Sequence, residues 1–196
     1  MVAGTASRMI ARFSSSALMS PACSLAKPPG LSTIRSKLIS VSLALLKTGD
    51  ELLLPANAYG PNKALAEGEL QSYGIRHRLY DPMDPDDLSA NITAQTRLVW
   101  LEAPGSVSME FPDLPELVRR CQARGVVCAL DNTWGAGLAF KPFDLLRTGA
   151  DSAKRLAVDI SVQALTKYPS GGGDVLMGSV ITRDEALHLK IRSEEH

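Results

Sequence analysis

Four apolar segments of this sequence are each followed at once by polar side chains, and this pattern limits the folds that the chain can adopt. Short apolar runs of this kind predict buried strands, and helix-like segments lie between them. The alternation predicts an α/β fold with a mostly parallel sheet flanked by helices. The four pairs are LLLP before Asn57 and Tyr59, VWL before Glu102, CAL before Asp131, and QAL before Thr166 and Lys167.

The expected elements follow from hydrophobic spacing and from Gly, Pro and Asp residues at the boundaries. Asp113 is expected to begin a helix, because Glu116 lies three residues on, as in a capping box. Residues 81–87 are read as a turn. Strands are predicted at 51–54, 76–80, 97–101, 126–130, 158–165 and 175–181, and helices at 30–49, 64–73, 113–125 and 184–191.

Composition narrows the classes of function. The 196 residues include 21 basic and 21 acidic side chains, so no overall field attracts the chain to nucleic acid or to an anionic membrane. A small-molecule partner is expected. The three cysteines lack ligand spacing, which predicts neither a disulfide framework nor a metal site and favours a cytoplasmic location. No apolar run reaches the length of a membrane span.

The amino-terminal segment has a different composition from the rest. The first acidic residue is Asp50, and basic side chains precede it among many Ser and Ala residues. This composition is typical of an organelle transit peptide. Residues 1–27 are therefore expected to be a leader, disordered or transit-like, and organelle targeting is the alternative to the cytoplasm.

Asp131 and Lys167 are opposite charges placed just past two strongly apolar strands. The carboxyl ends of parallel strands meet at one edge of a sheet, where ligands bind in open α/β folds. From the residues alone three readings stay open: a structural ion pair, two ordinary loop residues, or a ligand site. In the same loop, Trp134 is expected to be a packing residue and Asn132 a local hydrogen-bonding partner.

Six short strings, in order between about Gly30 and Ile191, carry a resemblance to a known family. Any one of them is weak, but their order and combination are specific. They are similar to motifs of the cysteine and methionine metabolism family of pyridoxal-phosphate enzymes, with cystathionine β-lyase the most similar activity. The implied fold is the large domain of fold-type I pyridoxal-phosphate enzymes. The strings are ANAYGP, YDP, LEAPGS, LDNTW, VDISVQALTKY and GGDVLMG.

The resemblance implies a set of site residues. Lys167 would hold pyridoxal 5'-phosphate covalently and, once released by the substrate amine, remove the α-proton. Asp131 would keep the pyridine nitrogen protonated. Tyr59 would stack on the ring and assist at the leaving sulfur. Thr166 would give its hydroxyl to the cofactor phosphate, together with backbone amides of Gly30 and Leu31.

The implied activity is carbon–sulfur β-lysis of cystathionine or a cysteine S-conjugate, with a thiol, pyruvate and ammonia as products. A γ-lyase or γ-synthase of the same family is the alternative. Family chains are longer at both ends and are homo-oligomers with shared sites. Residues 28–196 are therefore expected to be a partial large domain, and an inactive truncated fragment or a nonenzymatic binding module stays open.

Overall fold

The protein folds around a single six-stranded sheet with the strand order β2-β1-β3-β4-β5-β6. The computed structural model describes residues 32–149 and 155–193, so the expected leader, Gly30 and Leu31 lie outside the described residues. Neighbouring strands are parallel except β6, which runs antiparallel to β5. The prediction of a mostly parallel sheet is confirmed. The strands are β1 Glu51–Pro55, β2 Arg76–Tyr80, β3 Thr96–Glu102, β4 Val127–Asp131, β5 Ile160–Ala164 and β6 Gly178–Thr182.

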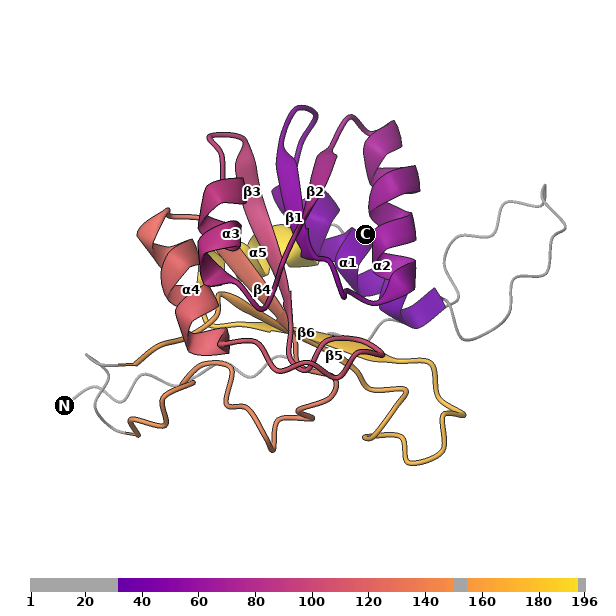
Figure 1. The fold of residues 1–196 in the computed structure, drawn as a ribbon. Helices are drawn as coiled ribbons and strands as arrows, with labels where there is room; N and C mark the ends of the chain where they lie inside the picture. The colour runs from indigo at the N-terminus through magenta and orange to yellow at the C-terminus, as the bar shows by residue number, and fades with distance from the viewer. Residues whose placement is uncertain (1–31, 150–154, 194–196) are drawn as a thin grey trace, which may run out of the picture.

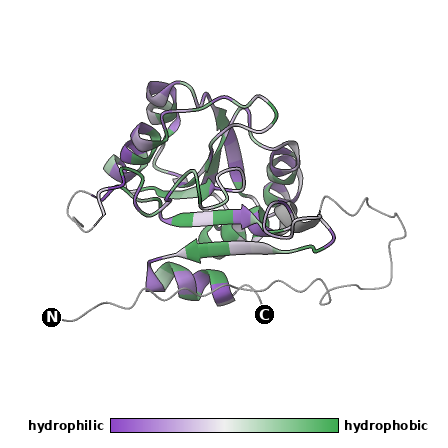
Figure 2. Ribbon diagram, turned by 90° about the horizontal axis from the view of Figure 1, so that it is seen from below, coloured by the Kyte–Doolittle hydropathy of each residue, from purple (hydrophilic) through white to green (hydrophobic). Residues whose placement is uncertain are grey.

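Helices cover both faces of this sheet (Figure 1). One face carries α1 Ser32–Leu45, α2 Gly60–Leu65, the π-helix η1 Ala66–Leu70 and α5 Glu185–Ser193. The other face carries α3 Pro85–Asn91 and α4 Leu114–Ala123. Most strands are rich in hydrophobic residues, whereas β2 (RHRLY) and the helices include many hydrophilic ones (Figure 2). The result is a three-layer arrangement in which the sheet is covered by helices on both sides.

Strand β3 shows how the sequence builds the two halves of the core. Its side chains alternate between faces with the period of two that a strand imposes. Leu98 and Trp100 pack into the cluster beneath α1 and η1, whereas Val99 and Leu101 pack into the cluster beneath α3 and α4. All four are at most 1% exposed. A strand buried on both faces needs a continuous apolar run, which is why the LVWL segment predicts it.

Helix α3 was missed by the sequence prediction, which read residues 81–87 as a turn. The Asp84 carboxylate accepts a hydrogen bond from the Asp86 N–H at 2.9 Å, and Pro85 follows as the first helical residue. Both are ordinary signals of a helix start, and the run of Asp and Pro residues masked them. The cap predicted at Asp113 is confirmed, since its carboxylate accepts from the Glu116 N–H at 3.0 Å.

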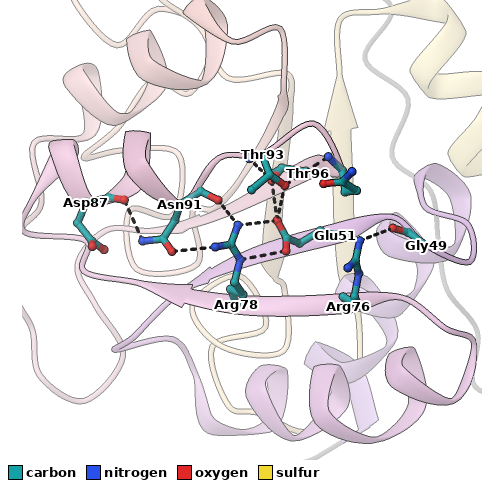
Figure 3. Close-up of polar contacts among 9 residues, drawn as sticks. Gly49, Glu51, Arg76, Arg78, Asp87, Asn91, Thr93 and Thr96 are labelled. Carbon is teal, nitrogen blue, oxygen red and sulfur yellow. Dashed lines mark hydrogen bonds and ion pairs between the residues drawn. The ribbon is translucent and has the colours of Figure 1, made fainter.

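A polar network fixes the amino-terminal ends of β1, β2 and β3 (Figure 3). The Glu51 carboxylate is buried and receives both Arg78 Nε and Nη2 at 3.0 Å. Thr93 and Thr96 donate their hydroxyls to the same carboxylate at 3.1 and 2.8 Å. A buried carboxylate is tolerated only when its lone pairs are used in this way. The network therefore joins three strands at the sheet edge opposite the loops that follow them.

Within residues 32–149 and 155–193, no helix has the length and apolar character needed to cross a bilayer. The same part of the chain contains no cluster of three or more His, Cys, Asp or Glu side chains that could hold a metal ion. Cys121 and Cys128 are buried free thiols.

Candidate active site

One pocket lies at the carboxyl-terminal edge of the sheet. The loops that follow β3, β4 and β5 gather below the strands at this edge (Figure 1). The pocket has an empty volume of about 290 Å³ and opens to solvent. It brings together three residues predicted from the sequence, namely Tyr59, Asp131 and Lys167. The other lining residues are Glu102, Ser106, Thr133 and Trp134.

Asp131 is held in place by Thr133. The Asp131 carboxylate accepts hydrogen bonds from both the backbone N–H and the hydroxyl of Thr133, the former at 3.0 Å. The Thr133 oxygen in turn accepts from the Ala164 N–H at 2.9 Å. This chain of contacts ties the end of β4 to the end of β5. The carboxylate thus has a fixed orientation set by the backbone of the neighbouring strand.

Lys167 lies close to two aromatic rings. Its Nζ is 5.7 Å from the centroid of the Tyr59 ring and 5.6 Å from that of Trp134. Both distances suit a cation over a ring face. The Trp134 side chain is 41% exposed, lines the pocket and lies against the Tyr168 ring, with 6.2 Å between the ring centroids. Within the described residues no ion pair joins Asp131 to Lys167, and the structural-pair reading has no support there.

Glu102 is one of the pocket residues to which the sequence prediction gave no role. Its carboxylate is 6% exposed and accepts from the Tyr59 backbone N–H at 3.0 Å. The side chains of Asn62 and Trp100 donate to it as well, each at 3.3 Å. Burial, with a smaller contribution from the Asp131 charge, raises the pKa of Glu102 to about 7. The carboxyl group therefore holds the α2 start that carries Tyr59 and titrates near neutral pH.

The loop after β3 is fixed from the opposite side by Asn57. The side-chain amide of Asn57 donates to the Glu110 carboxylate at 2.9 Å. The backbone carbonyl oxygen of Asn57 accepts from the Ser106 N–H at 3.1 Å. A Cβ on Gly105 would lie 2.1 Å from Asn57 Nδ2, so only glycine fits there. These contacts place Ser106 at the pocket rim.

Of the residues predicted to bind the cofactor phosphate, Thr166 lies within the described part of the chain. The Thr166 hydroxyl accepts from the Met177 N–H at 2.9 Å and donates to the Met177 carbonyl oxygen at 3.2 Å. In this structure the hydroxyl thus joins the end of β5 to the segment before β6. Asn132 behaves as predicted, since its amide donates to the Phe140 carbonyl oxygen at 3.4 Å and shapes the loop behind Asp131.

A family model described as the Cys/Met metabolism PLP-dependent enzymes matches residues 12–196. The chain belongs to this family. Two of its relatives carry the expected activity in their names: a cystathionine beta-lyase of Bordetella avium (35% identical over 80% of this chain and 36% of that protein) and a putative cystathionine beta-lyase of Saccharomyces cerevisiae (37% identical, 79% and 43%). The chain thus spans about two fifths of the length of these relatives.

Other relatives have different names. An L-alanine/L-glutamate racemase of Wolbachia pipientis and a cystathionine gamma-synthase/O-acetylhomoserine (thiol)-lyase of Bacillus subtilis are both 32% identical. They cover 81% and 76% of this chain, and 37% of each relative is matched. The crystal structure of metB from Corynebacterium glutamicum superposes with a TM-score of 0.68 at 22% identity, covering 81% of this chain and 38% of that one, which shows the shared fold.

Pyridoxal phosphate is the expected cofactor of a Cys/Met metabolism enzyme, and the kinds of side chain that line the pocket suit it. The cofactor needs an amine for covalent attachment, an acidic partner for its ring nitrogen and flat surfaces for its ring. Lys167, Asp131 and the Tyr59 and Trp134 rings supply these groups within one pocket. The backbone amides predicted to bind the phosphate, at Gly30 and Leu31, lie outside the described residues.

Proposed function

We propose that this chain carries the cofactor site of a pyridoxal-phosphate-dependent carbon–sulfur β-lyase that acts on cystathionine or on a cysteine S-conjugate. The observation that supports the proposal best is the single pocket lined by the Asp131 carboxylate, the Lys167 amine and two aromatic rings. The relatives named cystathionine beta-lyase favour β-lysis among the activities of the family. The products would be a thiol, pyruvate and ammonia.

Bound pyridoxal phosphate supplies an electron sink that stabilises negative charge at the substrate α-carbon. The amine of Lys167 would anchor the cofactor and, once the substrate amine has displaced it, would take the proton from that carbon. The ring faces of Tyr59 and Trp134 both lie within 6 Å of this amine and would limit where a flat group can sit. The proton transfer is efficient only from this fixed geometry.

Asp131 holds a proton at the ring nitrogen in this scheme. Its carboxylate is aimed by Thr133, whose hydroxyl is itself fixed by the Ala164 N–H. Because this support comes from the backbone of β5, the carboxylate does not need to reorganise during the reaction. Glu102 acts on Tyr59 through the backbone N–H and thereby positions the ring next to Lys167.

The second candidate is γ-chemistry of the same family, which the Bacillus subtilis relative supports. β-Lysis and γ-synthesis share the cofactor, the lysine and the aspartate, and they differ in where the substrate chain beyond the α-carbon is held. The substrate-binding groups that would decide between them are proposed to come partly from sequence outside this chain.

The test is reconstitution of the full chain with pyridoxal phosphate, followed by incubation with cystathionine. The proposal predicts a yellow protein that releases pyruvate and a free thiol, and a Lys167→Ala variant that does neither. Release of 2-oxobutyrate instead of pyruvate would favour γ-chemistry. A yellow band without any product would show a cofactor-binding chain that lacks activity by itself, and a band that persists in Lys167→Ala would reject the site.

A further inference from the structure

Two aromatic side chains form a surface that begins in the pocket and ends in solvent. Trp134 lines the pocket, and the Tyr168 ring lies against it, with 6.2 Å between the ring centroids and 52° between the ring planes. Tyr168 directly follows Lys167 in the sequence, and its side chain is 51% exposed. The aromatic surface therefore extends from the neighbourhood of the Lys167 amine to the outside of the pocket.

The surroundings of this aromatic pair are apolar as well. Most of the large hydrophobic side chains that stand exposed in the described part of the chain belong to the loops that follow β3, β4 and β5. These loops gather at the carboxyl-terminal edge of the sheet (Figure 1). Val107, next to the pocket residue Ser106, is 92% exposed, and Leu138, in the loop that carries Trp134, is 86% exposed. Exposed apolar groups around a pocket are typical of a binding surface.

Among the described residues that line the pocket, no second cation is present to bind the far end of a zwitterionic substrate. Lys167 is their one basic side chain, and it is proposed to hold the cofactor. Asp131 is proposed to meet the cofactor nitrogen, and Glu102 is buried against the Tyr59 backbone. Cystathionine carries a second amino group and a second carboxylate beyond its sulfur, and burial of such charges without partners is costly. An apolar group on the sulfur needs no such partners.

The reaction geometry brings the sulfur substituent near the aromatic pair. For proton transfer, the substrate α-carbon has to lie within about 3 Å of the Lys167 amine. The sulfur is attached to the neighbouring β-carbon, and the Trp134 ring centroid is 5.6 Å from the same amine. A group on the sulfur that points out of the pocket can therefore reach Tyr168 beyond Trp134.

We propose that the site takes cysteine S-conjugates whose sulfur bears an aromatic group, and that Tyr168 is a specificity residue that packs against this group. The inference rests on the proposed β-lyase function and narrows its substrate class. Aromatic side chains suit such a group because ring pairs add to the free energy gained from burial alone.

The test measures binding to the cofactor-free full chain, because the aromatic surface belongs to the protein itself. The probe is S-(p-nitrobenzyl)cysteine, whose nitroaromatic group quenches the fluorescence of a tryptophan that it contacts. The chain has two tryptophans, and only Trp134 is exposed, at 41% against 1% for Trp100. We expect saturable quenching that is absent in Trp134→Phe. S-benzylcysteine should displace the probe at an about two- to tenfold lower concentration than cystathionine, as expected for one aromatic contact.

Tyr168→Ser should raise the dissociation constant of the probe by about two- to tenfold, because it removes the contacting ring. Tyr168→Phe keeps the ring and should bind as the native chain does. Tyr73→Ser is the matched control, since Tyr73 is exposed to a similar extent, 56%, and lies just before β2 at the opposite edge of the sheet. It should leave binding unchanged. The comparison of S-benzylcysteine with cystathionine needs no variant, so it decides the matter if Tyr168→Ser does not fold.

The proposal is overturned if the native chain shows no saturable quenching, or if the quenching persists in Trp134→Phe. Equal displacement by S-benzylcysteine and cystathionine, or equal weakening in Tyr168→Ser and Tyr73→Ser, would also overturn it. Because binding is measured without cofactor and without turnover, a chain that releases no pyruvate still gives the answer. Pyruvate release from cystathionine together with any of these results would uphold the proposed function and reject this inference alone.

Discussion

Glu102 and Asp131 are register partners at the carboxyl ends of β3 and β4, so two carboxyl groups enter one pocket from neighbouring strands. Burial and the Asp131 charge raise the pKa of Glu102 to about 7. Near neutral pH the pair therefore carries a charge that depends on pH, although Glu102 lies behind Tyr59 and not at the position proposed for the cofactor nitrogen.

Glu102→Gln should change how stability depends on pH. A carboxyl pKa raised in the folded state means that the folded chain binds more protons than the unfolded chain between pH 4.5 and 7, so stability falls as pH rises through this range. The variant does not lose stability in this way. By pH 8 its unfolding free energy should exceed that of the native chain by up to about 3 kcal/mol. Urea unfolding at several pH values measures the difference. A constant difference across the range would contradict the raised pKa.

Thr133→Val should lower both the unfolding free energy and the cofactor affinity without changing the shape of the site. The variant leaves the Ala164 N–H without its acceptor and removes the hydroxyl that orients Asp131. An unpaired buried donor costs roughly 1–3 kcal/mol of unfolding free energy. Cofactor affinity, followed by the visible band, should fall as well. Thr133→Ser is the control, because it keeps the hydroxyl and should retain most of both properties.

Trp134 should contribute to cofactor retention and little to folding. Its side chain is 41% exposed and its ring lies 5.6 Å from Lys167 Nζ. Trp134→Ala should weaken binding of pyridoxal phosphate by about three- to tenfold, as expected for loss of one stacking surface. Trp134→Phe keeps a ring and should lose less. A fall in the unfolding midpoint of Trp134→Ala, with unchanged cofactor affinity, would instead make it a packing residue.

Glu51→Gln should separate folding from function, because the network around Glu51 lies at the opposite edge of the sheet (Figure 3). Loss of the charged partner of Arg78 should lower the unfolding free energy by roughly 1–3 kcal/mol. Hydrogen bonds hold the pKa of Glu51 below 4.5, so this stabilisation is present above that value and lost as pH falls further. The visible band of the reconstituted protein should be unaffected. A variant that loses the band while it stays folded would refute this separation.

The sequence predicts most of the sheet because its strands are continuous apolar runs. The strand at Arg76–Tyr80 was placed at its observed bounds, and the buried strand predicted at 97–101 lies within β3, Thr96–Glu102. The bounds of the last strand were predicted less accurately. It was predicted at 175–181 and lies at Gly178–Thr182, antiparallel to β5. The Thr166 hydroxyl contacts the backbone of Met177 just before this strand, and no local pattern predicts that contact.

The pocket was predicted only in part, for a physical reason. Tyr59, Asp131 and Lys167 follow apolar strands directly, so strand ends and motifs point to them. Glu102 follows a strand in the same way, but its raised pKa depends on burial beneath α2, which is a tertiary property.

Lys167 is proposed to hold the cofactor, with Asp131 at the cofactor's ring nitrogen. The most direct measurement is borohydride reduction of the chain reconstituted with pyridoxal phosphate, which fixes the cofactor on the lysine that bears it, followed by peptide mass spectrometry. We expect the phosphopyridoxyl group on Lys167, with labelling lost in Lys167→Ala and reduced in Asp131→Asn. A group found on Lys37 or on surface lysines, with Lys167 unmodified, would contradict it.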